Sequence, residues 1–329
     1  MTRRWLTLLV GLTLVFAAGC SSGPTQESAP SGGPGFPVSI PNRYGETVVP
    51  AEPKRVVSIG YTDQDTILAF GVVPVAIREF IGHQPSATWP WARPMLGDAK
   101  PEVLPASDVS VEKLAGLRPD LIVAMTAGLS REQYETFSKI APTLVPPAQF
   151  IDHGVPWQET TRLIGAALGK PARAEQMVTD LERRFAEARA AHPEFAGKLV
   201  AGARPNSVDP SQYMVWGSQD VRARFFSALG FGTPAEFDRR AGMRFYAQLS
   251  TELLGRLDDS DLVVWITGGE AERARIPQLA GYERLRVVRE NRTLVLDDEL
   301  SAALSFSSVL SLPAALDTLP ARMAERLPR

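Results

Sequence analysis

Two tryptophans and an arginine gather in one short, proline-containing segment of the sequence, residues 88–93. Trp89, Trp91 and Arg93 lie within five residues of one another, around Pro90. Flat indole faces and a guanidinium group suit the recognition of a bulky or anionic molecule through stacking, cation–π contacts and charge-assisted hydrogen bonds. The segment therefore predicts a ligand site, with at least one of the two tryptophans in a cleft.

Similar side chains follow predicted strands in both halves of the chain. In the first half, Tyr61 comes just after one predicted strand and Arg78 just after the next. Ligands collect at the carboxyl ends of strands in open α/β sheets, which favours both residues. Comparable positions in the second half belong to Trp216, Arg222, Arg224, Arg244, Tyr246 and Trp265. A late loop adds three residues that could also face a cleft: Ser305, Phe306 and Ser307.

Each of these residues also has a purely structural interpretation. Trp265 ends a strand that reads as buried, which favours a place in the core. Tyr61 could cap a sheet edge. An arginine is by default solvated or a helix cap, so we expect about half of the arginines named above to miss a ligand.

The composition excludes several other kinds of site. One cysteine and three histidines among 329 residues are too few for an internal disulfide or a convincing zinc cluster. A formal charge of -2 does not indicate the basic surface that nucleic-acid binding usually requires. With 44% hydrophobic and 22% charged residues, the composition is typical of a globular protein, and the length allows about two domains.

Two glycine-rich segments imitate nucleotide-binding loops only in part. Residues 165–170 read GAALGK, but the spacing is one residue short and Pro171 stands where Ser or Thr would bind magnesium. Residues 230–235 follow a predicted helix rather than a strand. The sequence contains neither Gly-x-Ser-x-Gly nor His-Glu-x-x-His, and its one cysteine precedes the predicted fold. An enzyme is therefore disfavoured.

The first twenty residues have the layout of a signal peptide. Arg3 and Arg4 precede an apolar run, residues 5–18, that ends in small residues directly before Cys20. As a helix the run would reach about 21 Å, short of the roughly 30 Å hydrocarbon core, so a permanent span is disfavoured. The stretch resembles a bacterial lipoprotein signal, although Ala17 replaces the usual leucine. Plain secretion with an incidental cysteine is the alternative.

The lipoprotein resemblance divides the amino-terminal part of the chain. It implies that residues 1–19 are cleaved off and that Cys20 is acylated. Residues 20–37 are rich in Ser, Gly and Pro and predict a flexible tether. Cleavage would leave 33 basic against 37 acidic residues, a net charge of -4, because residues 1–19 contain two arginines and no acid.

A repeated pattern predicts two α/β lobes. The β-branched residues 55–60, a helical stretch and the apolar residues 72–77 form a βαβ opening. Residues 110–124 then read as a helix followed by a buried strand, and residues 250–266 repeat this unit 140 positions later. The same unit therefore occurs once in each half.

A long amphipathic helix is predicted between the halves, from Pro171 to about Ala191. Its apolar residues recur at steps of three and four: Ala174, Met177, Val178, Leu181, Phe185 and Ala188. Such a helix would extend about 30 Å, enough to bridge two small domains. An ordinary surface helix of one large domain is the alternative. We expect an N-terminal lobe at 38–155, a bridging helical segment at 156–193 and a C-terminal lobe at 194–329.

Residues 50–320 resemble an iron-siderophore substrate-binding protein of an ABC importer. The matching pieces are PKRVVS and GYTDQD within 53–65, VEKL and PDLI within 111–122, residues 157–169, and LSFSSVLSLP at 304–313. The resemblance implies an α/β fold of two Rossmann-like lobes joined by one long α-helix, the class III periplasmic-binding-protein fold. It also implies an extracytoplasmic location, anchored to the outer face of the cytoplasmic membrane by the lipid on Cys20.

The same resemblance implies what the cleft holds. Its ligand would be a ferric siderophore whose iron is already coordinated, so the protein would recognise the chelate and provide neither a metal ligand nor a cofactor. The implied partner is an ABC permease, and we expect a monomer with no nucleic-acid partner. The expected ligand-binding residues are Tyr61, Arg78, Trp89, Trp91, Arg93, Trp216, Arg244 and Tyr246.

Glu112 and Glu252 have a separate implied role. In proteins of this type one exposed glutamate on each lobe docks to arginines of the permease, and these two match by position in a repeated Ser-x-Glu segment. An ion pair at the rim of an interface raises the rate and specificity of docking more than it raises the affinity. Alternatively, each glutamate stabilises a helix N-terminus capped by Ser110 or Ser250, worth roughly 0.3–1 kcal/mol.

Two classes of function stay open at the level of the sequence. One is a receptor for a ferric siderophore or, in its place, for haem or a corrinoid. The other is a secreted α/β enzyme acting on a bulky anionic substrate, which the absence of a nucleophile–base pattern disfavours. For the receptor, a rigid bridging helix predicts only a small closure on ligand binding.

Overall fold

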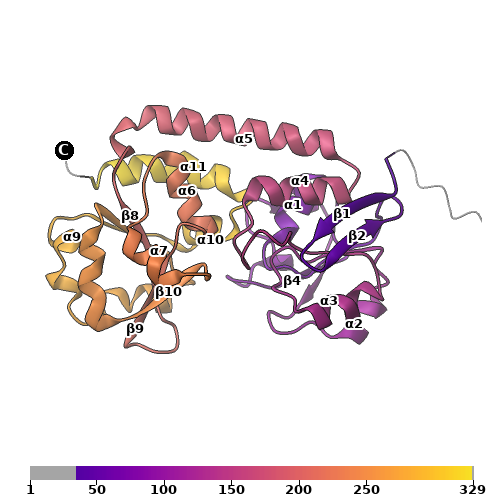
Figure 1. Ribbon diagram of the computed structural model, residues 1–329, viewed down its shortest axis with the longest axis horizontal. Coiled ribbons are helices and arrows are strands. Elements are labelled where there is room, and N and C mark those ends of the chain that lie inside the picture. Colours follow the sequence, from indigo (N-terminus) through magenta and orange to yellow (C-terminus); the bar gives the residue numbers. More distant parts are fainter. Residues whose placement is uncertain (1–34, 328–329) are drawn as a thin grey trace, which may run out of the picture. The chain divides into compact units, whose positions relative to one another are not determined.

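The computed structural model describes residues 35–327, which lie in one compact unit. The predicted signal peptide, Cys20 and residues 20–34 of the predicted tether lie outside the described residues. Within the described part of the chain, no helix is both long enough and apolar enough to cross a membrane. Two α/β lobes are visible in Figure 1, the first in indigo and magenta and the second in orange and yellow.

The first lobe is built on a five-stranded parallel sheet in the order β5-β4-β3-β6-β7. Its strands are β3 (Val56–Ser58), β4 (Ala76–Arg78), β5 (Glu102–Leu104), β6 (Leu121–Val123) and β7 (Thr143–Leu144). Its helices are α1 (Asp63–Ala69), α2 (Val111–Gly116) and α3 (Arg131–Ser138). A separate antiparallel hairpin pairs β1 (Val38–Asn42) with β2 (Gly45–Val49).

Four strands of this sheet, β3, β4, β6 and β7, are buried on both faces. Side chains alternate along a strand, so Val56 and Val57 point to opposite sides. Val56 packs with Ile67 on one side, and Val57 packs with Leu114 on the other. A parallel strand that is covered on both faces favours a continuous run of apolar residues, as Val56 and Val57 form in β3. This local pattern is why the strand could be predicted from the sequence.

The second lobe contains a mixed sheet in the order β10-β9-β8-β11-β12. Strands β8, β11 and β12 are parallel, whereas β9 is antiparallel to both of its neighbours. The strands are β8 (Val200–Pro205), β9 (Gln212–Trp216), β10 (Tyr246–Ser250), β11 (Leu262–Trp265) and β12 (Thr293–Val295). Trp265 is 0% exposed and packs in the core, as the sequence predicts.

Five helices between residues 221 and 306 of the second lobe surround this sheet or follow it. They are α6 (Val221–Leu229), α7 (Ala235–Ala241), α8 (Glu270–Arg273), α9 (Arg286–Arg289) and α10 (Asp298–Phe306). Helix α6 begins at Asp220, whose side chain accepts a hydrogen bond from the Arg222 amide, and it ends at Gly230, which adopts a left-handed conformation. This is the usual cap arrangement of a globular helix.

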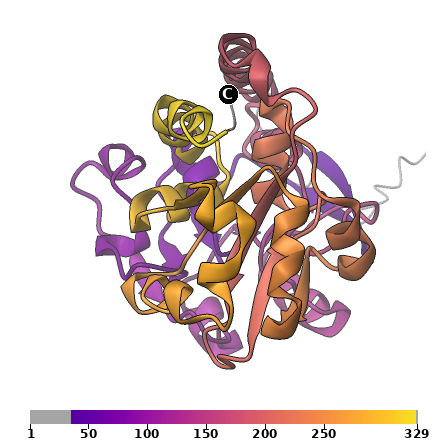
Figure 2. The ribbon, with the colours of Figure 1, turned by 90° about the vertical axis from the view of Figure 1, so that its left-hand side faces the viewer.

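Helix α5 spans Pro171–Ala191, as its apolar periodicity predicts, and it contributes to the cores of both lobes. Near its start Ala174 packs into the first lobe, whereas Leu181 and Phe185 pack into the second. It follows α4 (Trp157–Ala167) and lies beside α11 (Ser311–Ala324), as Figures 1 and 2 show. The helix therefore joins the two lobes.

The repeated Ser-x-Glu units are capped as the sequence predicts. The Ser110 hydroxyl accepts a hydrogen bond from the Lys113 amide at 3.1 Å, and the Ser250 hydroxyl accepts one from the Glu252 amide at 3.3 Å. The two units differ in that the first begins helix α2, whereas the second begins a 3₁₀ helix at Thr251–Asp259.

Candidate ligand-binding site

A cavity of about 400 Å³ lies between elements of the two lobes. This volume is within the range typical of sites for small organic ligands. Its lining residues from the first lobe and the bridging segment are Tyr61, Thr62, Thr66, Phe80, Met125, Thr126, His153, Val155, Trp157 and Thr160. Its second-lobe residues are Arg204, Met214, Trp216, Val221, Arg222, Phe245, Tyr246 and the run Ser305, Phe306, Ser307 and Ser308.

Tyr61 and Arg78 lie together on the first-lobe side. Tyr61 lines the cavity, as a residue just past the carboxyl end of β3 should. The Arg78 guanidinium is 4.2 Å from the centre of the Tyr61 ring, and its Nη2 donates to the Tyr61 hydroxyl at 2.9 Å. Arg78 is 7% exposed and lies outside the cavity lining, so it supports Tyr61 from behind.

Asp63 fixes the loops that follow β3 and β6. Its carboxylate accepts a hydrogen bond from the Met125 amide at 2.7 Å and one from the Thr126 hydroxyl at 2.8 Å. A Cβ atom at Gly60 would come within 2.0 Å of this carboxylate, so the position requires glycine. Burial raises the pKa of Asp63 to about 6. Thr126 and Met125 are thereby held in the cavity wall.

The second-lobe wall is largely one face of the sheet. Met214 and Trp216 are two residues apart on β9 and so point to the same side. On the neighbouring strands, Arg204 of β8 lies opposite Met214, and Tyr246 of β10 lies opposite Trp216. Gly202 lets the indole of Trp216 lie close to the sheet, because a Cβ there would be 2.5 Å from the Trp216 Cδ1.

An arginine lies flat against the indole of this wall. The Arg222 guanidinium is 3.7 Å from the Trp216 ring centre, and Asp220 holds it through two hydrogen bonds of 2.8 and 2.6 Å. Asp220 is fully buried and Arg222 is 9% exposed. The stacked and paired guanidinium has little freedom to reorient, so its position is set before any ligand arrives.

Trp89 and Trp91 occupy a different place from the one that the sequence suggested. Their rings are stacked, with centroids 5.2 Å apart and planes within 2°, and neither residue lines the cavity. Trp89 is 5% exposed and packs against Ala302 and Phe306 of α10. Their apolar surface is thus used in packing between segments far apart in the sequence.

The structure also places Arg93 and Arg244 outside the cavity lining. Arg93 is exposed and donates to the Gln84 side chain at 2.9 Å. Arg244 is exposed at the end of the segment before Phe245, which does line the cavity. Arg224 lies beside a separate hollow rather than the main cavity. Of the eight predicted ligand-binding residues, the structure brings three into the lining: Tyr61, Trp216 and Tyr246.

Several lining residues were not singled out from the sequence. His153 packs edge-on against Phe245, with the ring centres 5.3 Å apart, and burial lowers its pKa. Arg204 and Met214 could have been found from their place on strands flanking Trp216, but the strand register was not predicted. Phe306 and its two neighbouring serines, named as a late loop, do line the cavity. Within residues 35–327, no group of three or more His, Cys, Asp or Glu side chains could hold a metal ion.

A family model described as periplasmic binding protein matches residues 56–300 of this chain. The chain belongs to the periplasmic binding protein family. A crystal structure of a periplasmic solute binding protein from Mycobacterium smegmatis superposes with a TM-score of 0.78, at 31% identity, covering 88% of this chain and 99% of that one. The structure of Streptococcus pneumoniae PiaA in complex with ferrichrome superposes with a TM-score of 0.75, at 22% identity, covering 88% and 98%.

Two curated relatives from Bacillus subtilis strain 168 add to this family assignment. The protein named iron(3+)-hydroxamate-binding protein YxeB is 26% identical over 310 residues, which is 88% of each chain. The protein named putative ABC transporter substrate-binding lipoprotein YhfQ is 30% identical over 190 residues. That second alignment spans 57% of this chain and about half, 55%, of the relative.

Proposed function

We propose that this periplasmic binding protein is the extracytoplasmic substrate-binding component of an ABC importer, which captures a ferric siderophore and delivers it to the permease. The observation that carries the proposal is the cavity of about 400 Å³, walled by aromatic and hydroxyl side chains from both lobes. Relatives named as binding proteins for ferric hydroxamate and ferric citrate, and the neighbour solved in complex with ferrichrome, support this ligand class.

The cavity suits a metal that arrives inside its own chelate. A siderophore saturates the coordination of Fe³⁺, so the protein needs to contact only the organic shell. Tyr61, Trp216, Tyr246 and Phe306 offer flat faces and hydroxyl donors to such a shell. The binding step therefore requires no nucleophile and no general base, and we propose binding rather than catalysis as the activity.

The position of the protein in the cell forms part of the same proposal. Cleavage before Cys20 and acylation of that cysteine would tether the protein to the outer face of the cytoplasmic membrane. We also propose an N-terminal lobe at 38–155, a bridging segment at 156–193 and a C-terminal lobe at 194–329, a division that the separate sheets and α5 support. We propose that the protein works as a monomer.

Glu112 and Glu252 are proposed to contact the permease. Both side chains are exposed, one on each lobe, in the first turn of a capped helix. Within residues 35–327, neither carboxylate forms an ion pair with another side chain. Two free carboxylates, one per lobe, match a partner that presents a cation to each lobe.

A fluorescence titration tests the proposed function. Trp157 and Trp216 line the cavity, so a bound iron chelate should quench the intrinsic fluorescence saturably at one equivalent. The titration would compare several ferric siderophores and haem, each with its iron-free form as the control. Saturable quenching by a ferric siderophore supports the proposal. Tighter binding of haem would favour the haem alternative, and no quenching by any of these compounds would refute the proposal.

A further inference from the structure

The cavity has almost no free charge, although two arginines line it. Among its twenty-one lining residues, only Arg204 and Arg222 carry a full charge. Each of these guanidinium groups forms two hydrogen bonds to a single carboxylate, from Glu272 and Asp220 respectively. Both positive charges are therefore compensated within the protein before a ligand binds.

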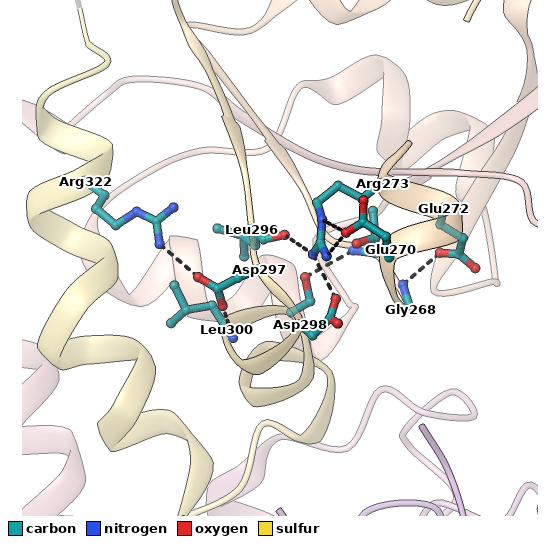
Figure 3. Close-up of polar contacts among 11 residues, drawn as sticks. Gly268, Glu270, Glu272, Arg273, Leu296, Asp297, Asp298, Leu300 and Arg322 are labelled. Atoms are coloured by element: carbon teal, nitrogen blue, oxygen red, sulfur yellow. Dashed lines mark hydrogen bonds and ion pairs between the residues drawn. The ribbon is translucent and has the colours of Figure 1, made fainter. Parts of the chain in front are cut away.

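The Arg204 pair joins strand β8 to helix α8, which contains Glu272. Arg204 Nε and Nη2 donate to the two Glu272 carboxylate oxygens at 2.7 and 2.6 Å, and the two side chains are 27% and 13% exposed. Glu272 also accepts a hydrogen bond from the Gly268 amide at 2.8 Å, which Figure 3 shows. Such a two-point pair has a fixed geometry, and the Glu272 carboxylate neutralises the charge of the guanidinium.

The Arg222 pair is more deeply buried. The side chain of Asp220 is 0% exposed and that of Arg222 is 11% exposed. Asp220 also caps helix α6 by accepting a hydrogen bond from the Arg222 amide, so the cap holds its carboxylate beside the guanidinium. An anionic ligand would have to compete with this carboxylate in a site largely closed to water, which is unfavourable.

The other titratable groups near the cavity do not change this balance. Burial lowers the pKa of His153, so its imidazole is neutral at physiological pH. Arg78 lies behind Tyr61, and its Nη1 and Nη2 donate to Tyr61 and to the carbonyl oxygens of Ile59 and Ala106. Arg78 therefore polarises the Tyr61 hydroxyl but does not itself reach into the cavity.

From this charge balance, and resting on the proposed function, we infer that the ligand is an electroneutral ferric chelate with an apolar periphery. Three hydroxamates, each a monoanion, neutralise Fe³⁺ and give such a complex, whereas three catecholates leave a trianion. A trianion in this cavity would be buried opposite cations that are already paired, which carries a desolvation penalty. A neutral trihydroxamate complex needs only aromatic contacts and single hydroxyl donors, which the lining supplies.

The test compares two chelates of opposite charge type on the purified protein by isothermal titration calorimetry. The probes are ferrichrome, a neutral trihydroxamate complex, and ferric enterobactin, a tricatecholate trianion. The expected result is a preference for ferrichrome of about 100-fold or more. Equal or tighter binding of the trianion would overturn the charge inference and leave the proposed function standing. If neither of these chelates nor any other ferric siderophore binds, the proposed function fails as well.

One substitution tests the role of the pairing itself. Glu272→Gln frees the charge of Arg204 while its amide oxygen can still accept from Gly268. The variant should bind ferric enterobactin about tenfold more tightly than the unchanged protein, with ferrichrome affinity altered by no more than about twofold. The matched control is Glu236→Gln, which frees Arg239 and Arg240 on the surface outside the cavity lining. An unchanged affinity for the trianion in Glu272→Gln would contradict the inference.

Discussion

Ser308 donates a hydrogen bond to the Asp65 carboxylate at 2.7 Å across 243 positions of the sequence. The same carboxylate oxygen accepts a second bond of 2.7 Å from the Trp91 indole. Asp65 belongs to α1 of the first lobe, whereas Ser308 follows α10, which packs in the core of the second lobe. The lobes are therefore joined by this buried contact as well as by α5.

The Asp65 contact should make the stability of the protein depend on pH. Burial raises the pKa of Asp65 to about 7, far above its ordinary value of 3.8. Its contribution to folding is therefore fully present below about pH 4 and is lost as the pH rises through about 7, because the charged form is disfavoured in the fold.

Replacing Asp65 with Asn removes this titration. The free energy of unfolding of Asp65→Asn, relative to the unchanged protein, should increase between pH 5 and pH 8, as measured by urea denaturation at both values. Asp317→Asn, at a surface carboxylate that pairs with Arg184, is the control and should show no comparable change. If the unfolding free energies of Asp65→Asn and the unchanged protein differ by the same amount at pH 5 and pH 8, Asp65 does not titrate in this range.

Only a small closure on ligand binding is expected. Helix α5 packs its Ala174 into one lobe core and its Phe185 into the other, so bending it would disrupt both. The buried Asp65 contact adds a second constraint near the cavity. Small-angle scattering should therefore give nearly equal radii of gyration for the free and the bound protein, and a difference of several ångströms would contradict this account.

Ligand affinity should depend on Trp216 and not on Arg93. The Trp216 indole lines the cavity and supports the Arg222 guanidinium. Trp216→Ala should weaken binding about two- to thirtyfold, since an aromatic contact is worth roughly 0.5–2 kcal/mol and 1.4 kcal/mol corresponds to a factor of ten. Arg93→Ala, at an exposed residue outside the lining, should leave the affinity unchanged. A calorimetric titration in which the two variants behave in the opposite way would place the site at the Trp89–Trp91 segment.

Charge reversal at the two proposed docking glutamates should separate transport from binding. Glu112→Lys combined with Glu252→Lys should abolish most iron-siderophore uptake by cells, while the affinity of the purified protein stays within about twofold. Glu132→Lys, at an exposed glutamate in the first turn of α3, is the matched control and should transport normally. A loss of ligand affinity in the double variant would instead move these residues into the ligand site.

The parts of the fold that depend on local pattern could be read from the sequence. The 3.6-residue periodicity of residues 171–191 predicted α5 to its ends, because amphipathic spacing and the proline at its start are local signals. The buried strands β3, β6 and β11 and the serine caps of the two Ser-x-Glu units were predicted for the same reason.

The parts of the site that depend on long-range pairing could not be read in this way. Trp89 and Trp91 looked like ligand groups because nothing near them in the sequence indicates Phe306 or Ala302 as packing partners. Nor does any local signal show that Arg204 is neutralised by Glu272, 68 positions later. The second-lobe wall is a sheet face rather than a row of strand ends, and that depends on the antiparallel register of β9.

The most direct test of the account is the position of the iron in crystals of the complex with a ferric siderophore. The anomalous scattering of iron should give one peak in the cavity between Tyr61 and Trp216, with every coordinating atom belonging to the chelate. An iron peak outside this cavity, or iron coordinated by a protein side chain such as His153, would contradict the central claim that the protein binds iron only within a chelate held between its lobes.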